Sequence, residues 1–124
     1  MKKIYFDIAA TTPVNPKVAT LVSNIMTQTF GNPSSIHKFG QESHSVIERA
    51  RLQLASALNC EPGEIIFTGG GSESNNLVLQ GILQSGDHII TSAYEHPAIL
   101  NVVEALELKG IQSTLINPNK NGAV

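Results

Sequence analysis

The stretch EIIFTGGGSESNN, residues 64–76, is the part of the sequence that indicates the fold most clearly. A mostly β-branched and aromatic run, residues 64–68, stops at three glycines, and Ser72 follows them as a typical helix start. Glycines allow positive φ and let the backbone approach a ligand closely. A strand, a glycine turn and a helix N-terminus in this order favour an anion, since the first helical amides and the helix dipole face it. The stretch therefore predicts a phosphate site, in which Ser72 caps the helix or binds the phosphate.

The same pattern is also typical of a plain tight turn, so on its own it leaves both interpretations equally open. No lysine follows the glycines, as it does in a P-loop, and the spacing is not Gly-x-Gly-x-x-Gly. A phosphate held here is therefore expected to belong to a ligand other than a nucleotide.

The order of elements predicts an α/β fold. From residue 64 onward, strand, helix, strand, helix and strand follow one another, which is typical of a parallel sheet with helical crossovers. Upstream, Asn15 and Pro16 are typical of a helix start. We expect a helix from Pro16 that is broken at Phe30, helices near 37–59, 72–83 and 97–109, and strands near 64–68, 88–93 and 111–116.

Composition indicates one small globular domain of 124 residues, 41% hydrophobic and 15% charged. The net charge of −2 gives no electrostatic reason to expect nucleic acid or an anionic membrane as a partner.

No apolar run reaches membrane-spanning length or resembles a secretory leader. The single Cys60 excludes an internal disulfide and is typical of a reducing compartment. We expect a cytoplasmic protein.

His96 is the second candidate site residue. It lies in Tyr94-Glu95-His96-Pro97, between a predicted strand and a predicted helix. Ligands of parallel sheets bind at the carboxyl ends of strands, so His96 and the glycine loop could meet one ligand. An imidazole there could stack on a planar ring or move protons. The alternative is that His96 only caps the helix ahead of Pro97.

The remaining histidines and the cysteine carry weaker signals. His37 and His44 are seven residues apart on a predicted helix, without the Cys or carboxylate pattern of a metal site. His88 precedes a strand and is expected to be structural. No basic cluster flanks Cys60, so we interpret it as a helix-boundary residue. No metal site is expected.

Four motifs in this order resemble the cysteine desulfurases, pyridoxal-phosphate enzymes of the class V aminotransferase group. Two lie upstream of the glycine loop: DIAATTPVNP at residues 7–16 and GNPSSIH at residues 31–37. The others are the glycine stretch, similar to the family's cofactor-phosphate loop, and Tyr94-Glu95-His96-Pro97, similar to the site of its ring-stacking histidine. Together they extend over nearly all of the chain.

The resemblance implies a role for each motif. It implies that Gly71 and Ser72 hold the phosphate of pyridoxal 5'-phosphate, and that His96 stacks on the pyridine ring and assists proton transfer. It places Ala9 and Ala10 beside the substrate, and residues 32–37 near the active-site entrance and the dimer partner.

The implied activity removes sulfur from L-cysteine, giving L-alanine and an enzyme persulfide for iron–sulfur cluster assembly or tRNA thiolation. The implied fold is the N-terminal part of a fold-type I pyridoxal-phosphate transferase, a homodimer with a mostly parallel sheet and helices on both faces. Residues 1–35 are then an N-terminal segment with one helix, and residues 36–124 begin the cofactor-binding large domain, which is incomplete at its C-terminus.

Some residues depart from the family pattern. Ile8 stands where a polar or aromatic residue is usual, and Gly69 and Ser72 replace the more frequent Ser and Thr. The family's Schiff-base lysine lies in a Ser-x-His-Lys context that this sequence lacks, and its catalytic cysteine is expected beyond Val124. We therefore expect the 124 residues to be the first third of a desulfurase and inactive by themselves. Two alternatives stay open: a truncated non-catalytic protein that pairs with a desulfurase or a separate C-terminal half, and a selenocysteine lyase or other class V transferase.

Overall fold

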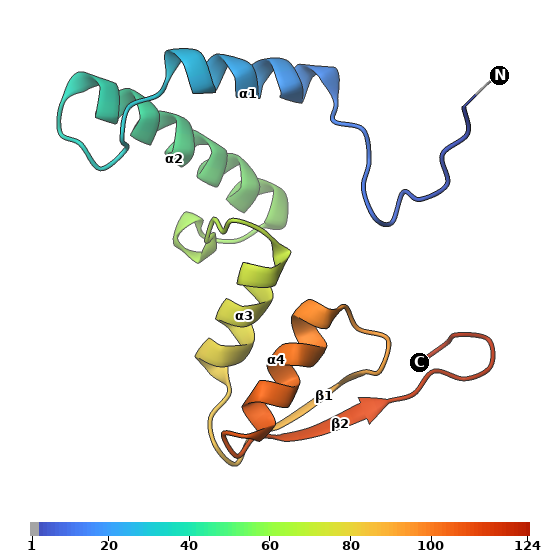
Figure 1. Cartoon of the computed structure of the whole chain (residues 1–124). Coiled ribbons are helices and arrows are strands. Elements are labelled where there is room, and N and C mark those ends of the chain that lie inside the picture. Colours follow the sequence, from blue (N-terminus) through green and yellow to red (C-terminus); the bar gives the residue numbers. More distant parts are fainter. Residues whose placement is uncertain (1–2) are drawn as a thin grey trace. The chain divides into compact units, whose positions relative to one another are not determined.

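The computed structural model describes residues 3–124, which group into two compact units, one up to Ile65 and one from Ile66 onward (Figure 1). The N-terminal unit holds helix α1 (Pro16–Gln28), helix α2 (Lys38–Leu58) and the short 3₁₀ helix η1 (Pro62–Glu64). The C-terminal unit holds helix α3 (Gly71–Ile82), strand β1 (His88–Ser92), helix α4 (Pro97–Glu107) and strand β2 (Gln112–Ile116). The boundary expected near residue 35 concerns the domains of a longer protein and stays a prediction.

The start of α1 follows the sequence prediction. The Asn15 side chain accepts a hydrogen bond from the Lys17 amide at 2.9 Å, and Pro16 occupies the first helical position. Val18, Leu21, Val22 and Met26 recur at helical spacing, yet each is about half exposed or more, and α1 has no buried residue among those described. α1 is therefore amphipathic, but the other described residues leave its apolar side chains largely uncovered.

Two glycines let the loop before α2 pack tightly against that helix. A Cβ at Gly40 would lie 2.2 Å from the Ser35 carbonyl oxygen, and a Cβ at Gly31 would lie 2.3 Å from the Phe39 carbonyl oxygen. The buried Ser43 hydroxyl donates to the Thr29 carbonyl at 3.1 Å and joins α2 to the end of α1. Backbone contacts this close exclude a side chain, which explains why both positions are glycine.

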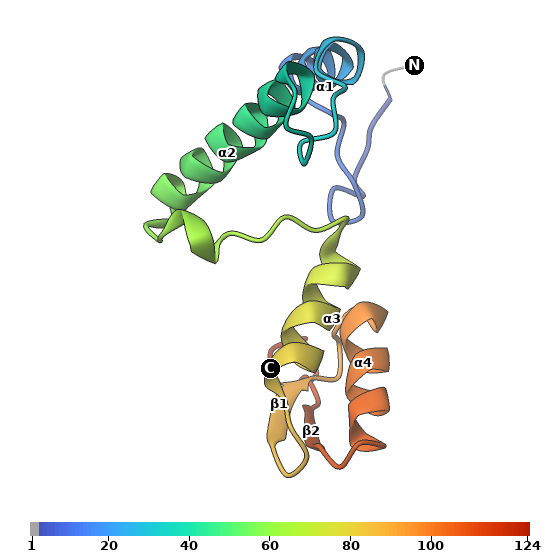
Figure 2. The same ribbon diagram turned by 90° about the vertical axis from the view of Figure 1, so that its left-hand side faces the viewer.

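The C-terminal unit has the predicted parallel α/β arrangement. β1 and β2 are parallel and in register from His88 opposite Gln112 to Ser92 opposite Ile116. α4 connects the two strands, and α3 lies beside α4 in both views (Figures 1 and 2). The buried core comprises Val102, Leu106 and Ile111, packed against the partly buried Leu79, Leu83 and Ile89.

The prediction of a strand at 64–68 is wrong for the described residues. Glu64 ends η1, and Ile65 has extended dihedrals of φ −90° and ψ 119° without a place in a sheet. A strand needs a neighbour that exchanges backbone hydrogen bonds with it. Within residues 3–124, β1 and β2 pair with each other and leave this segment extended but unpaired.

The glycine loop differs from its prediction in two details. The N-cap of α3 is Gly70 and not Ser72, which lies inside the first turn. None of the three glycines adopts a left-handed φ, and Gly70 is extended at φ 163°. A left-handed φ therefore does not explain the three glycines.

No helix among the described residues is both long enough and apolar enough to cross a membrane.

Candidate functional site

The N-terminus of α3 presents unpaired backbone amides. The first helical hydrogen bond runs from the Ser74 amide to the Gly70 carbonyl, at 3.1 Å. The amides of Gly71, Ser72 and Glu73 precede it and so have no partner inside the helix. The Ser72 hydroxyl is exposed and forms no hydrogen bond within residues 3–124. These donors point to anion binding.

The glycine loop is held on both sides by side chains. The Thr68 and Ser74 hydroxyls lie 2.7 Å apart, and each lies 3.3 Å from the Gly70 carbonyl oxygen, so that one hydroxyl can donate to the other while the second donates to the carbonyl. On the other side, the Gly69 amide donates to Glu73 Oε2 at 2.6 Å. Sequence reasoning missed Glu73. Its position three residues after the helix cap, as in a capping box, is the signal that could have revealed it.

Open space lies over the two glycines nearest the helix. A Cβ built on Gly70 or Gly71 would meet no atom within 4 Å among the described residues. Neither glycine is therefore required by a left-handed backbone or by a packed neighbour, and the space beside them leaves room for a ligand to approach the backbone.

His96 both caps a helix and faces the site. It is the N-cap of α4, and its Nδ1 accepts a hydrogen bond from the Ala98 amide at 3.0 Å. His96 therefore caps α4, and capping uses only one ring nitrogen. With Nδ1 as acceptor, a neutral imidazole carries its proton on Nε2, and the exposed side chain keeps that nitrogen and its ring faces available.

One groove contains both principal candidates. Ser72 and His96 line the same open cavity of about 480 Å³ in the C-terminal unit. Asn76 and Gln80 of α3 and Asn101 of α4 add amide groups to its wall. Two motifs that are 24 positions apart in sequence therefore meet at one place, the N-terminal ends of α3 and α4. The groove is thus lined by Ser72 from the glycine stretch and by the His96 side chain.

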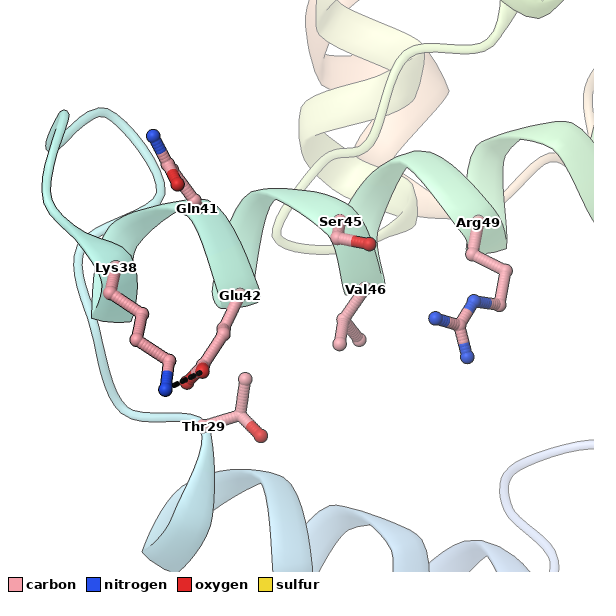
Figure 3. A pocket seen from close by; sticks show the side chains of 7 residues that line it. All are labelled: Thr29, Lys38, Gln41, Glu42, Ser45, Val46 and Arg49. Atoms are coloured by element: carbon pink, nitrogen blue, oxygen red, sulfur yellow. Dashed lines mark ion pairs between the residues drawn. The ribbon is translucent and has the colours of Figure 1, made fainter.

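A second cavity of similar volume lies on the N-terminal unit and has different chemistry. It is lined mainly by α2 and includes Thr29, Lys38, Glu42 and Arg49 (Figure 3). The Lys38 and Glu42 side chains point toward each other there and pair at 3.8 Å, both largely exposed. An exposed ion pair of this kind contributes little, and none of the predicted phosphate or ring-binding residues lies in this cavity.

The remaining candidates have structural roles or stay untested. His37 caps α2 by accepting from the Gly40 amide at 3.3 Å, and His88 Nε2 bonds the Thr114 hydroxyl at 2.8 Å across the sheet. Cys60 is half-buried at the end of α2. Within residues 3–124, no three His, Cys, Asp or Glu side chains gather as metal ligands. The roles implied for Ala9, Ala10 and residues 32–37, all in the N-terminal unit, stay predictions.

Parallel strands, a crossover helix and a glycine loop that opens a helix define an α/β protein. The family model for class-V aminotransferases matches residues 4–124, and the chain belongs to that family. A relative in Vibrio cholerae serotype O1 (El Tor Inaba N16961), the cysteine desulfurase IscS, is 43% identical over 98% of this chain. The chain spans about a third, 32%, of that relative's length.

Solved structures agree with the fold. A protein described as SspA in complex with cysteine has a TM-score of 0.84 and 39% identity, over 93% of this chain and 34% of its own. A C-DES mutant with glycine covalently linked to its PLP cofactor has a TM-score of 0.61 and 25% identity, over 81% of this chain and 26% of its own. The predicted fold class, the N-terminal part of a fold-type I transferase, is confirmed.

Proposed function

We propose that this chain supplies the phosphate grip and the ring-stacking histidine of a site for pyridoxal 5'-phosphate. The observation that carries the proposal is the shared groove of Ser72 and His96. The family and the solved relative that carries a PLP cofactor support the same cofactor class.

Three features of the glycine loop and His96 fit pyridoxal 5'-phosphate. The amides of Gly71 and Ser72 and the Ser72 hydroxyl are available donors for phosphate oxygens. The empty space over Gly70 and Gly71 admits a phosphate at backbone distance. The His96 ring lies along the same groove, where it can cover one face of a planar heterocycle.

The cofactor, when bound, supplies an electron sink for carbanion chemistry, and the protein supplies binding and orientation. The α3 amides and the Ser72 hydroxyl fix the phosphate end. The cap hydrogen bond from Ala98 orients the His96 ring and places its proton on Nε2, so that the Nε2–H group is the one that can donate a hydrogen bond in the groove. Charge at the phosphate is further balanced by the positive end of the α3 dipole.

We further propose that the whole protein is a cysteine desulfurase. L-Cysteine gives up its sulfur to a protein thiol, and L-alanine and a persulfide result. The name of the Vibrio relative and the cysteine complex of SspA support this reaction. We also propose that the protein is a cytoplasmic homodimer. It would pass sulfur to an iron–sulfur scaffold or to tRNA thiolation. The covalent lysine and the sulfur-accepting cysteine would come from outside these 124 residues.

The test measures two products in the intact protein that carries this sequence. With pyridoxal phosphate and L-cysteine, it should release alanine and form persulfide in equal amounts. Selenocysteine used at a far higher rate than cysteine would favour a selenocysteine lyase instead. Binding of cofactor without either product would contradict the desulfurase activity, and would favour a non-catalytic partner or another class V transferase.

A further inference from the structure

The carboxylate of Glu73 is bound to the backbone of the glycine loop. Glu73 occupies the third position of α3, and its Oε2 accepts from the Gly69 amide at 2.6 Å. In a capping box, a glutamate at this position reaches back to the amide of the N-cap residue. Here the cap is Gly70, and the carboxylate reaches one residue further back. Glu73 therefore holds the backbone of Gly69, the residue just before the cap of α3.

The glycine at position 69 makes room for this contact. A Cβ on Gly69 would lie 3.1 Å from Glu73 Oε2, tighter than ordinary van der Waals contact. The corresponding positions on Gly70 and Gly71 are open. The carboxylate thus lies close to Gly69 and away from the Cβ positions of Gly70 and Gly71.

The hydrogen bond of Glu73 and its charge act in opposite directions on a bound phosphate. Glu73 is exposed and forms no ion pair within residues 3–124, so no neighbouring side chain in this part neutralises it. A negative charge suits the α3 N-terminus when that end is empty. The same charge repels a phosphate placed on the adjacent amides. The benefit of Glu73 to phosphate binding therefore has to come from its geometry.

We propose, resting on the cofactor site proposed above, that Glu73 is a positioning residue. By accepting the Gly69 hydrogen bond, it holds the loop in the shape that aims the Gly71 and Ser72 amides at the phosphate. The hydroxyl pair of Thr68 and Ser74 makes a second contact with the loop, at the Gly70 carbonyl. The acceptor oxygen of Glu73 is what the loop requires, and its charge is not.

The experiment compares pyridoxal phosphate with pyridoxal, which lacks the phosphate, on the cofactor-free intact protein. Glu73→Ala should raise the dissociation constant of pyridoxal phosphate by about tenfold and leave that of pyridoxal unchanged. Glu73→Gln keeps an acceptor oxygen and removes the charge, so its dissociation constant should stay near the wild-type value or fall below it. Glu104→Ala is the matched control, an exposed glutamate on α4 in the same unit.

Two results would overturn the role of Glu73. One is wild-type affinity of Glu73→Ala for pyridoxal phosphate. The other is an equal loss in Glu73→Gln, which would mean that the charge and not the acceptor is required. Failure of the cofactor site itself gives a different result: the wild-type protein would bind pyridoxal phosphate no more tightly than pyridoxal. Far-UV circular dichroism confirms that each variant is folded before the titration.

Discussion

At the scale of the residue, His96 shows how one side chain serves both a helix and a site. Its Nδ1 is committed to the Ala98 amide as the cap of α4. That hydrogen bond also orients the ring in the groove shared with Ser72. The sequence placed His96 between a strand and a helix and left the cap and the ring-binding roles as alternatives. The structure makes them compatible, because they use different atoms of the imidazole.

Substitution of His96 by asparagine separates these two roles. Asparagine is a good N-cap, so His96→Asn should keep the stability of α4 within about 0.5 kcal/mol. It removes the ring, so the proposed activity of the intact protein should fall by about a hundredfold or more. Urea denaturation and alanine production measure the two effects. Unchanged turnover in His96→Asn would show that the imidazole has no part in the chemistry.

At the scale of the element, glycines act for different reasons at different places. Gly70 and Gly71 leave open space where a ligand can approach, whereas Gly40 lets α2 pack on the preceding loop. Gly81 lies in the interior of α3, and a Cβ there would meet nothing within 4 Å. The sequence does not distinguish these glycines. The atoms around each one show whether a side chain could be accommodated at that position.

Alanine substitutions test this distinction. Gly40→Ala should destabilise the N-terminal unit by about 2–3 kcal/mol, because the new methyl group would overlap the Ser35 and Asn32 carbonyl oxygens. Gly81→Ala should stabilise α3 by up to about 1 kcal/mol, because alanine has the better helix propensity. Thermal unfolding followed by circular dichroism measures both. A neutral Gly40→Ala would mean that the loop at 31–35 packs less closely than described.

At the scale of the whole molecule, the buried apolar residues are few and lie mostly in the C-terminal unit. Val102, Leu106 and Ile111 form its core, while most of the apolar side chains of α1 and those of Ile66 and Phe67 are about half exposed or more. A small core supplies little free energy against chain entropy. The fold of the C-terminal unit should therefore depend strongly on each of these three side chains.

A matched pair of leucines tests that dependence. Leu106 is 3% exposed and Leu108 is 89% exposed, two positions further along. Leu106→Ala should cost about 2–5 kcal/mol through lost burial and a cavity. Leu108→Ala should change stability by less than about 0.5 kcal/mol. Hydrogen exchange of the β1 and β2 amides reports the local stability of this unit. Equal protection in both variants would contradict the assigned core.

Helices α1, α2, α3 and α4, the helix starts at Pro16 and Pro97, and two parallel strands could be predicted from the sequence, whereas the phosphate role of the glycine stretch stays a prediction. These follow from local chemistry: proline and capping residues fix helix starts, and apolar spacing fixes helix faces. It also predicted a strand at 64–68 that the described residues do not pair, because a strand depends on a distant neighbour that local sequence does not specify. The three-dimensional structure added three findings. Ser72 and His96 line one groove, the N-cap of α3 is Gly70 and not Ser72, and the Glu73 carboxylate accepts a hydrogen bond from the Gly69 amide. Ser72 and His96 are 24 positions apart, so only the packing of α3 against α4 brings them together, whereas the cap at Gly70 and the Glu73–Gly69 hydrogen bond are local and depend on where α3 begins.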